Sequence, residues 1–158
     1  MPITINDLTI SLNGVDMDAL LEDWSWAMPE SVKPILVTAM GDVFAQGESG
    51  TVYFVDMVQG TVLPIAEDGA SFESLLTDND FVTRQLFPSR VVQLRAAGIN
   101  LKPQQVYSYK KPLVLGGDDN IENVESTEVS VHVSIHGQVH RQVRDLPDGT
   151  PIDNIEIN

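Results

Sequence analysis

The sequence predicts an α+β fold, in which an antiparallel β-sheet, built from a meander and later strands, packs against several short helices. Two observations predict it. Three runs rich in β-branched and aromatic residues lie within residues 35–66 and are joined by short connections that contain glycine. Apolar residues at helical spacing then follow over residues 72–98. A length of 158 residues corresponds to about one domain, so we expect a single domain spanning residues 1–158.

The N-terminal part predicts a strand and then a helix. Apolar residues alternate over residues 3–12, which is typical of a strand. From residue 16 the spacing becomes i, i+3, i+4, i+7, which places one apolar stripe on a helix. Pro29 and Pro34 limit that helix to about three turns. The stripe consists of Met17, Leu20, Leu21 and Trp24.

The three runs at residues 35–46, 51–58 and 61–66 predict the strands of the meander. In the second run both faces are largely apolar, so we expect this strand to be covered on both sides. One of its faces consists of Tyr53, Val55 and Met57, and the other of Val52, Phe54, Asp56 and Val58.

Helices are predicted next, over residues 72–78 and 78–98. The second has Asp78 or Asn79 as its N-cap and Gly98 as its C-terminal stop. Pro88 should kink or divide it, because proline cannot donate to the preceding turn.

The last third predicts a short strand over residues 106–109 and a second strand in "TEVSVHVSI", residues 127–135. In the second strand the alternate residues Val129, Val131, Val133 and Ile135 would face inward. The apolar spacing from Val139 onward favours a helix over residues 137–145. A continued strand remains an alternative, because residues 139, 141 and 143 are also alternate positions.

The charge of the chain is strongly negative and unevenly distributed. The sequence holds 9 Lys and Arg against 23 Asp and Glu, a net charge of −14. Residues 1–83 carry a net charge of −13, whereas residues 84–158 carry −1. A field of this sign repels nucleic acids and anionic membranes and attracts basic partners. The alternative interpretation is that the excess negative charge only keeps the protein soluble and serves no partner.

Several classes of protein are excluded by composition. The absence of cysteine excludes disulfides, thiol nucleophiles and cysteine-based metal sites. No apolar run is long enough to cross a bilayer, and the N-terminus lacks the basic start and apolar block of a secretory signal. We therefore expect a cytoplasmic protein.

The histidines are concentrated in one stretch, and they raise the question of a metal site. His132, His136 and His140 are each four residues apart. A zinc site usually takes at least three protein ligands, but the helical zinc-protease motif requires a glutamate after its first histidine, where this chain has Gly137. The nearby Arg141 also opposes a cation. Surface or interface histidines are the favoured interpretation.

Other chemical motifs are missing or incomplete. The stretch that begins at Asp118 resembles the start of a calcium loop, but its sixth position is Asn123 and its twelfth is Val129, where glycine and glutamate are required. The sequence has no G-x-S-x-G motif and no phosphate-cradling glycine loop. It therefore nominates no catalytic residue, no metal ligand and no cofactor.

Several segments resemble a known family. They include "TAMGDVF", "VYFVDMVQGTV", "PLVLGG" and "GQVHRQVRDLPDGT". In these segments the chain is similar to the C-terminal domain of bacterial immunity proteins that neutralise type VI secretion DNase effectors. The resemblance covers about residues 15–152, and it implies an α+β domain that binds and blocks a co-encoded toxin without catalysis. Longer members carry a preceding N-terminal module, which we expect this chain to lack.

The predicted function is therefore that of a cytoplasmic immunity protein that occludes a basic effector, which the resemblance implies to be a nuclease. The expected partner is the co-encoded toxin, with no nucleic acid and no membrane. The predicted contact residues are Asp16, Asp18, Glu22, Asp23, Glu67, Asp68 and Glu73. The alternatives are a metal-dependent hydrolase that uses the three histidines, and an interaction module without a toxin partner or one that forms a homodimer.

Overall fold

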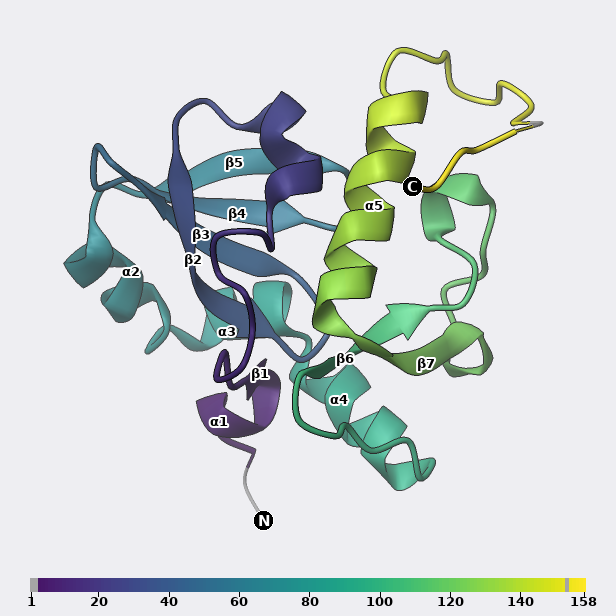
Figure 1. Cartoon of the computed structure of the whole chain (residues 1–158). Helices are drawn as coiled ribbons and strands as arrows, with labels where there is room; N and C mark the ends of the chain where they lie inside the picture. Colours follow the sequence, from purple (N-terminus) through teal and green to yellow (C-terminus); the bar gives the residue numbers. More distant parts are fainter. Residues whose placement is uncertain (1–2, 153) are drawn as a thin grey trace.

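The structure, a computed structural model, describes residues 3–152 and 154–158. Two β-sheets and several helices are arranged along the chain as shown in Figure 1. The strands are β1 (Thr9–Ile10), β2 (Val32–Thr38), β3 (Val43–Gly47), β4 (Val52–Asp56), β5 (Thr61–Ala66), β6 (Gln105–Tyr109) and β7 (Val124–Glu128). The α-helices are α1 (Ile5–Leu8), α2 (Gly69–Leu75), α3 (Asn79–Leu86), α4 (Pro88–Ala96) and α5 (Val129–Val143). The 3-10 helices are η1 (Glu22–Ala27), η2 (Leu113–Leu115) and η3 (Ile121–Asn123).

The larger sheet has five antiparallel strands in the order β1-β2-β3-β4-β5, so each strand pairs with its neighbour in sequence. A separate antiparallel pair is formed by β6 and β7. The α+β class predicted from the sequence is confirmed. The predicted first run of the meander is two strands rather than one, because a turn at residues 39–42 separates β2 from β3.

Helices cover both faces of the larger sheet. On one face Phe44 and Phe54 pack in a core with side chains of α2, α3 and α4, among them Phe72, Phe81, Leu86, Val91 and Leu94. On the other face Val43 and Val55 pack with η1 and α5, through residues that include Leu21, Trp24, Val129 and Val133. Because successive side chains of a strand point to opposite faces, β3 and β4 serve both cores. The prediction that the second run is covered on both sides is confirmed.

The N-terminal elements differ from the prediction. Residues 5–8 form a short helix and only Thr9 and Ile10 are a strand, pairing with β2. The predicted helix from residue 16 is a series of turns followed by η1. Its apolar residues nevertheless point inward as predicted, since Leu20, Leu21 and Trp24 are buried. The stripe therefore indicated three of its four residues correctly, whereas Met17 is only partly buried, and the helix is of another kind.

The helices after the meander agree with the prediction. Asp78 caps α3 by accepting hydrogen bonds from the backbone N–H groups of Asp80 and Phe81. Pro88 begins α4 and so divides the predicted long helix in two. Phe87 joins the two halves in a left-handed conformation with φ of 52°, which is rare for a bulky residue.

The strand predicted at residues 127–135 is wrong beyond Glu128. Residues 129–143 form one helix, α5, which includes the predicted helix up to residue 143 and also the residues before it. Val131, which was expected to face inward, is exposed, whereas Val129 and Val133 are buried. The burial pattern thus follows the helical spacing of four residues rather than the alternation of a strand.

Helix α5 lies side by side with η1, and the two make close polar contacts (Figure 1). The indole N–H of Trp24 donates to the carbonyl oxygen of Val133 over 2.9 Å, and that of Trp26 donates to Gly137 O over 3.2 Å. The two indoles stack with their ring centroids 5.8 Å apart. At Gly137 a Cβ atom would lie 2.5 Å from the backbone oxygen of Asp23, so only glycine allows this approach.

Replacing Gly137 by alanine should therefore separate η1 from α5. We expect Gly137→Ala to lower the free energy of unfolding by about 2 kcal/mol, because the added methyl group meets rigid backbone. The measurement is urea denaturation followed by tryptophan fluorescence. Gly69→Ala is the matched control, since a Cβ there meets nothing closer than 3.6 Å; we expect it to be neutral or stabilising by up to about 1 kcal/mol. Equal stability of the two variants would contradict this packing.

Candidate protein-binding surface

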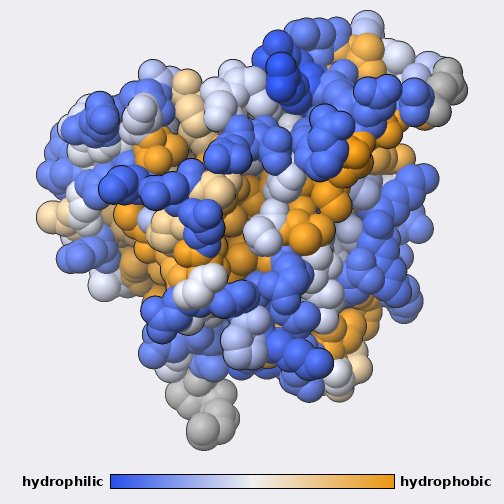
Figure 2. Space-filling model, in the orientation of Figure 1, coloured by the Kyte–Doolittle hydropathy of each residue, from blue (hydrophilic) through white to orange (hydrophobic). Residues whose placement is uncertain are grey.

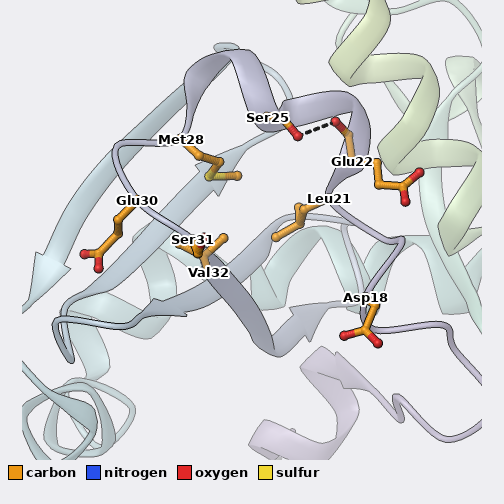
Figure 3. Close-up of a pocket in the computed structure, with 8 residues that line it drawn as sticks. All are labelled: Asp18, Leu21, Glu22, Ser25, Met28, Glu30, Ser31 and Val32. Carbon is orange, nitrogen blue, oxygen red and sulfur yellow. Dashed lines mark hydrogen bonds between the residues drawn. The ribbon is translucent and has the colours of Figure 1, made fainter.

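A hollow of about 380 Å³ lies beside η1 and the start of β2, and we call it the acidic groove. Its lining residues are Asp18, Leu21, Glu22, Ser25, Met28, Glu30, Ser31 and Val32. Figure 3 shows Leu21 and Met28 over the middle of the hollow, with Asp18 and Glu30 at opposite ends. Apolar side chains at the centre and carboxylates at the ends are a combination that suits a protein partner with basic residues.

The carboxylates of the acidic groove differ in whether they are hydrogen-bonded within the protein. Glu30 accepts hydrogen bonds from the backbone N–H and hydroxyl of Ser49 and from the hydroxyl of Tyr53, and these bonds lower the pKa of its carboxyl. The side chains of Asp18 and Glu22 make no hydrogen bond or ion pair to the described residues. Glu30 is thus fixed within the protein, while the other two carboxylates are available to a partner.

Two further predicted contact residues lie near the acidic groove but have structural contacts. Asp16 accepts hydrogen bonds from the backbone N–H groups of Asp18 and Ala19 and so stabilises the turn before η1. Asp23 accepts a hydrogen bond from the hydroxyl of Ser134 and thereby joins η1 to α5. Substituting either one would alter local structure as well as surface charge.

The remaining predicted residues, Glu67, Asp68 and Glu73, lie at α2. Asp68 is the N-cap of that helix and accepts from the backbone N–H of Ser71. Helix α2 packs through Phe72 on the face of the sheet opposite to η1. The structure therefore brings together the residues around η1, but it places the α2 group on the other face of the sheet. Both groups remain predictions as contact sites.

The surface around η1 and α5 has a mixed character. Figure 2 shows hydrophilic residues over most of this side of the molecule, with apolar side chains gathered near its centre.

Glu30 was not predicted as part of a site. The only signal for it in the sequence is its position in the same acidic stretch as Glu22 and Asp23.

The three histidines all lie on the buried face of α5, so the prediction of surface histidines is wrong. The ring of His132 contacts the Ser108 hydroxyl through Nδ1 (2.7 Å) and the Gly41 carbonyl through Nε2 (3.1 Å). His140 Nε2 lies 2.7 Å from the carbonyl oxygen of Met57. A carbonyl can only accept, so the ring nitrogen that contacts it must carry the proton.

Two glycines make room for these rings. A Cβ atom at Gly41 would lie 2.1 Å from His132 Nε2, and one at Gly60 would lie 2.3 Å from His140 Nδ1. Both glycines also have positive φ, of 89° and 71°. The imidazoles of His132 and His140 thus fit into places that only glycine leaves open.

Burial lowers the pKa of all three histidines. For His132 desolvation is the main cause, followed by the charge of His136, and its pKa lies well below the ordinary value of 6.5. His136 donates through Nδ1 to the His132 carbonyl oxygen over 2.8 Å. Among the residues that the structure describes, no group of three or more His, Asp or Glu side chains is arranged to hold a metal ion. This geometry gives no support to the alternative of a metal-dependent hydrolase.

The family resemblance is confirmed for about half of the chain. Residues 66–140 match the family of the T6SS immunity protein Tdi1, C-terminal. No curated protein matches the chain in sequence. The crystal structure of Atu4351 from Agrobacterium tumefaciens has a similar fold, with a TM-score of 0.54 and 17% sequence identity. The similarity covers 77% of this chain and 61% of Atu4351, and at this identity it shows the fold alone.

The Tdi1 C-terminal match begins at the end of β5 and ends within α5. It includes α2 with Glu67, Asp68 and Glu73, as well as the three histidines. The acidic groove precedes it in the sequence. The match is also shorter than the resemblance predicted over residues 15–152.

No helix in the described part of the chain combines the length and the apolar character that crossing a bilayer requires.

The buried histidines predict a loss of stability in acid. Unfolded histidine has a pKa near 6.5, and the folded value is lower, so the unfolded chain gains protons first as the pH falls below about 6.5. His132 should therefore cost about 1 to 2 kcal/mol of unfolding free energy between pH 7 and pH 5. The measurement is urea denaturation at both pH values for the parent protein and His132→Asn. The parent should lose more stability on acidification than the variant; equal losses would contradict a neutral buried His132.

Proposed function

We propose that this protein is an immunity protein that binds a cognate type VI secretion effector and blocks its toxic activity. The match of residues 66–140 to the Tdi1 C-terminal family is the observation that carries the proposal. The proposed action is occlusion of the effector by a single domain formed by residues 1–158, in the cytoplasm and without catalysis. The effector is proposed to be encoded beside this protein.

The net charge of −14 supports a basic effector, and a nuclease is the most natural kind. A nuclease holds phosphates with lysine and arginine side chains, so its cleft attracts a surface rich in carboxylates. Electrostatic attraction of this kind speeds association and weakens as salt is added. Tight binding that depends on ionic strength is the expected property of the complex.

The acidic groove is the proposed contact surface. Its carboxylates at Asp18 and Glu22 are exposed and make no hydrogen bond or ion pair with the described residues, so they can pair with basic residues without breaking a bond within the fold. Leu21 and Met28 provide apolar area between them. The predicted residues at α2 form the second, separate candidate surface, and one experiment can distinguish the two.

Protection of cells tests the proposal as a whole. Co-expression with the effector encoded by the neighbouring gene should restore growth that the effector alone abolishes. If growth is not restored while the protein is folded and abundant, the immunity role is wrong. A catalytically inactive effector should also bind the purified protein in isothermal titration calorimetry.

Charge reversal tests the surface. The double variant Asp18→Lys/Glu22→Lys should weaken binding to the inactive effector by at least about tenfold, because two attractive contacts become repulsive. Glu67→Lys/Glu73→Lys is the matched control, with the same charge change on the other face of the sheet. Loss of binding only in the α2 variant would assign the contact to that surface instead.

A further inference from the structure

A second hollow, of about 270 Å³, lies at the opposite end of β4 from the β3–β4 turn, and we call it the Asp42 pocket. Segments far apart in sequence meet there: the β2–β3 turn, the end of β4, the α3–α4 junction and the end of β6. Its polar residues are Asp42, Asp56, Gln59, Arg90, Tyr109 and Asp119. Neither the family match nor the proposed contact surface assigns a role to it.

Asp42 is the main reason to regard this pocket as a binding site. The residue is only 4% exposed, yet it lines the pocket. One carboxyl oxygen, Oδ1, accepts from the backbone N–H of Met57 over 2.9 Å. The other oxygen has no hydrogen-bond partner among the described residues. That oxygen is not enclosed by the protein, so it is an acceptor that faces the pocket and can pair with a donor that binds there.

The other charged groups leave the pocket with an excess of carboxylates. Asp119 accepts from the Tyr109 hydroxyl over 2.6 Å, and Arg90 Nη1 lies 3.4 Å away from the same carboxylate oxygen. The charge of Arg90 thus balances that of Asp119, although Arg90 Nη1 is buried and donates no hydrogen bond to the described residues. Asp56 uses Oδ1 to accept from the N–H groups of Val58 and Gln59, and its other oxygen has no partner among the described residues. The unbalanced acceptors are thus those of Asp42 and Asp56.

Apolar side chains form the rest of the lining, namely Met40, Val58, Phe87 and Leu113. Phe87 is 43% exposed and is held in its left-handed conformation at the junction of α3 and α4. Strained residues of this kind are found preferentially where ligands bind. A volume of 270 Å³ is slightly smaller than typical pockets for drug-sized ligands and suits a single side chain.

We propose that the Asp42 pocket binds a guanidinium or alkylammonium group on an aliphatic stem, as an arginine or lysine side chain of a partner protein carries. The charged head donates to the free oxygens of Asp42 and Asp56, and the stem lies against the apolar wall, as long basic side chains do at protein surfaces. The proposal does not depend on the immunity role, since the pocket is separate from the acidic groove.

Binding of a cation should release a proton. Burial, together with the charge of Asp56, raises the pKa of Asp42 to about 8, so its carboxyl is mostly protonated at pH 7. Besides Asp56, the charged or titratable groups around it are Arg90, Tyr109 and Asp119, with His132 hydrogen-bonded to the adjacent Gly41. A bound cation favours the ionised carboxylate. Affinity should therefore rise as the pH increases from 6.5 to 8.5.

The test uses ethylguanidinium and the blocked peptide acetyl-Gly-Arg-Gly-amide as probes, with NMR of the ¹⁵N-labelled protein. Both should cause saturable shifts of the amides of Met57, Val58 and Gln59, with Kd of about 1 mM. Asp42→Asn and Asp56→Asn should each weaken binding by at least about tenfold, whereas Glu48→Gln, in the exposed turn between β3 and β4, should leave it unchanged. Two pocket variants keep the test decisive if one of them folds poorly.

The outcomes separate the sources of the cation. Binding of both probes, with affinity that rises with pH in the parent but not in Asp42→Asn, supports the proposal. Binding of ethylguanidinium alone would overturn the assignment to a protein side chain and leave a site for a free small cation. Absence of saturable shifts, or an affinity in the Asp42→Asn and Asp56→Asn variants equal to that of the parent protein, would overturn the site altogether. Loss of effector binding in the acidic-groove variant with intact probe binding would show that the two surfaces act separately.

Discussion

The attachment of α5 to the larger sheet through buried imidazoles is the constraint on which the rest of the structure depends. His132 and His140 reach the carbonyl oxygens of Gly41 and Met57, which lie where β2 turns into β3 and just beyond the end of β4. Backbone carbonyls at strand ends have no neighbour in the sheet, and burying them without a donor would cost stability. The histidines supply these donors while they remain neutral.

The same helix holds η1 in place, so the two sides of the molecule are connected through it. Trp24 donates to a carbonyl oxygen of α5 and also lies 5.8 Å from the ring of His140. Arg144, just after α5, lies 5.2 Å from the centre of the Trp26 ring. The position of the acidic groove beside η1 is therefore set by contacts with a helix more than a hundred residues later in the chain.

The sequence was sufficient to predict the sheet and the middle helices, because their signals are local. A run of β-branched and aromatic residues identifies β4 and capping identifies α3, and each depends on a few adjacent residues. Residues 129–135 were misassigned for a physical reason: the valines alternate, and β-branched residues favour strands, but burial against the sheet selects the helical spacing of Val129 and Val133. The histidine spacing of four residues was the signal for the helix.

The candidate sites were only partly predictable. The acids around η1 are close in sequence and stay close in space, whereas α2 follows the meander and reaches the opposite face of the sheet. Asp42 and Asp56 could not be paired from the sequence, because they come together only through the register of β3 and β4, which sets Val43 opposite Val55. An aspartate at the end of a strand is common, so neither residue by itself predicts a pocket that both of them line.

The glycines that receive the imidazoles also restrict how the polypeptide can change in length. Inserting one residue between His132 and His140 would turn the later ring by about 100° around the helix axis and carry it away from Gly60. A whole extra turn would instead shift it about 5 Å along the axis. The spacing between His132 and His140 is thus fixed by the two glycines that face them. Insertions or deletions in α5 are tolerable only outside residues 132–140.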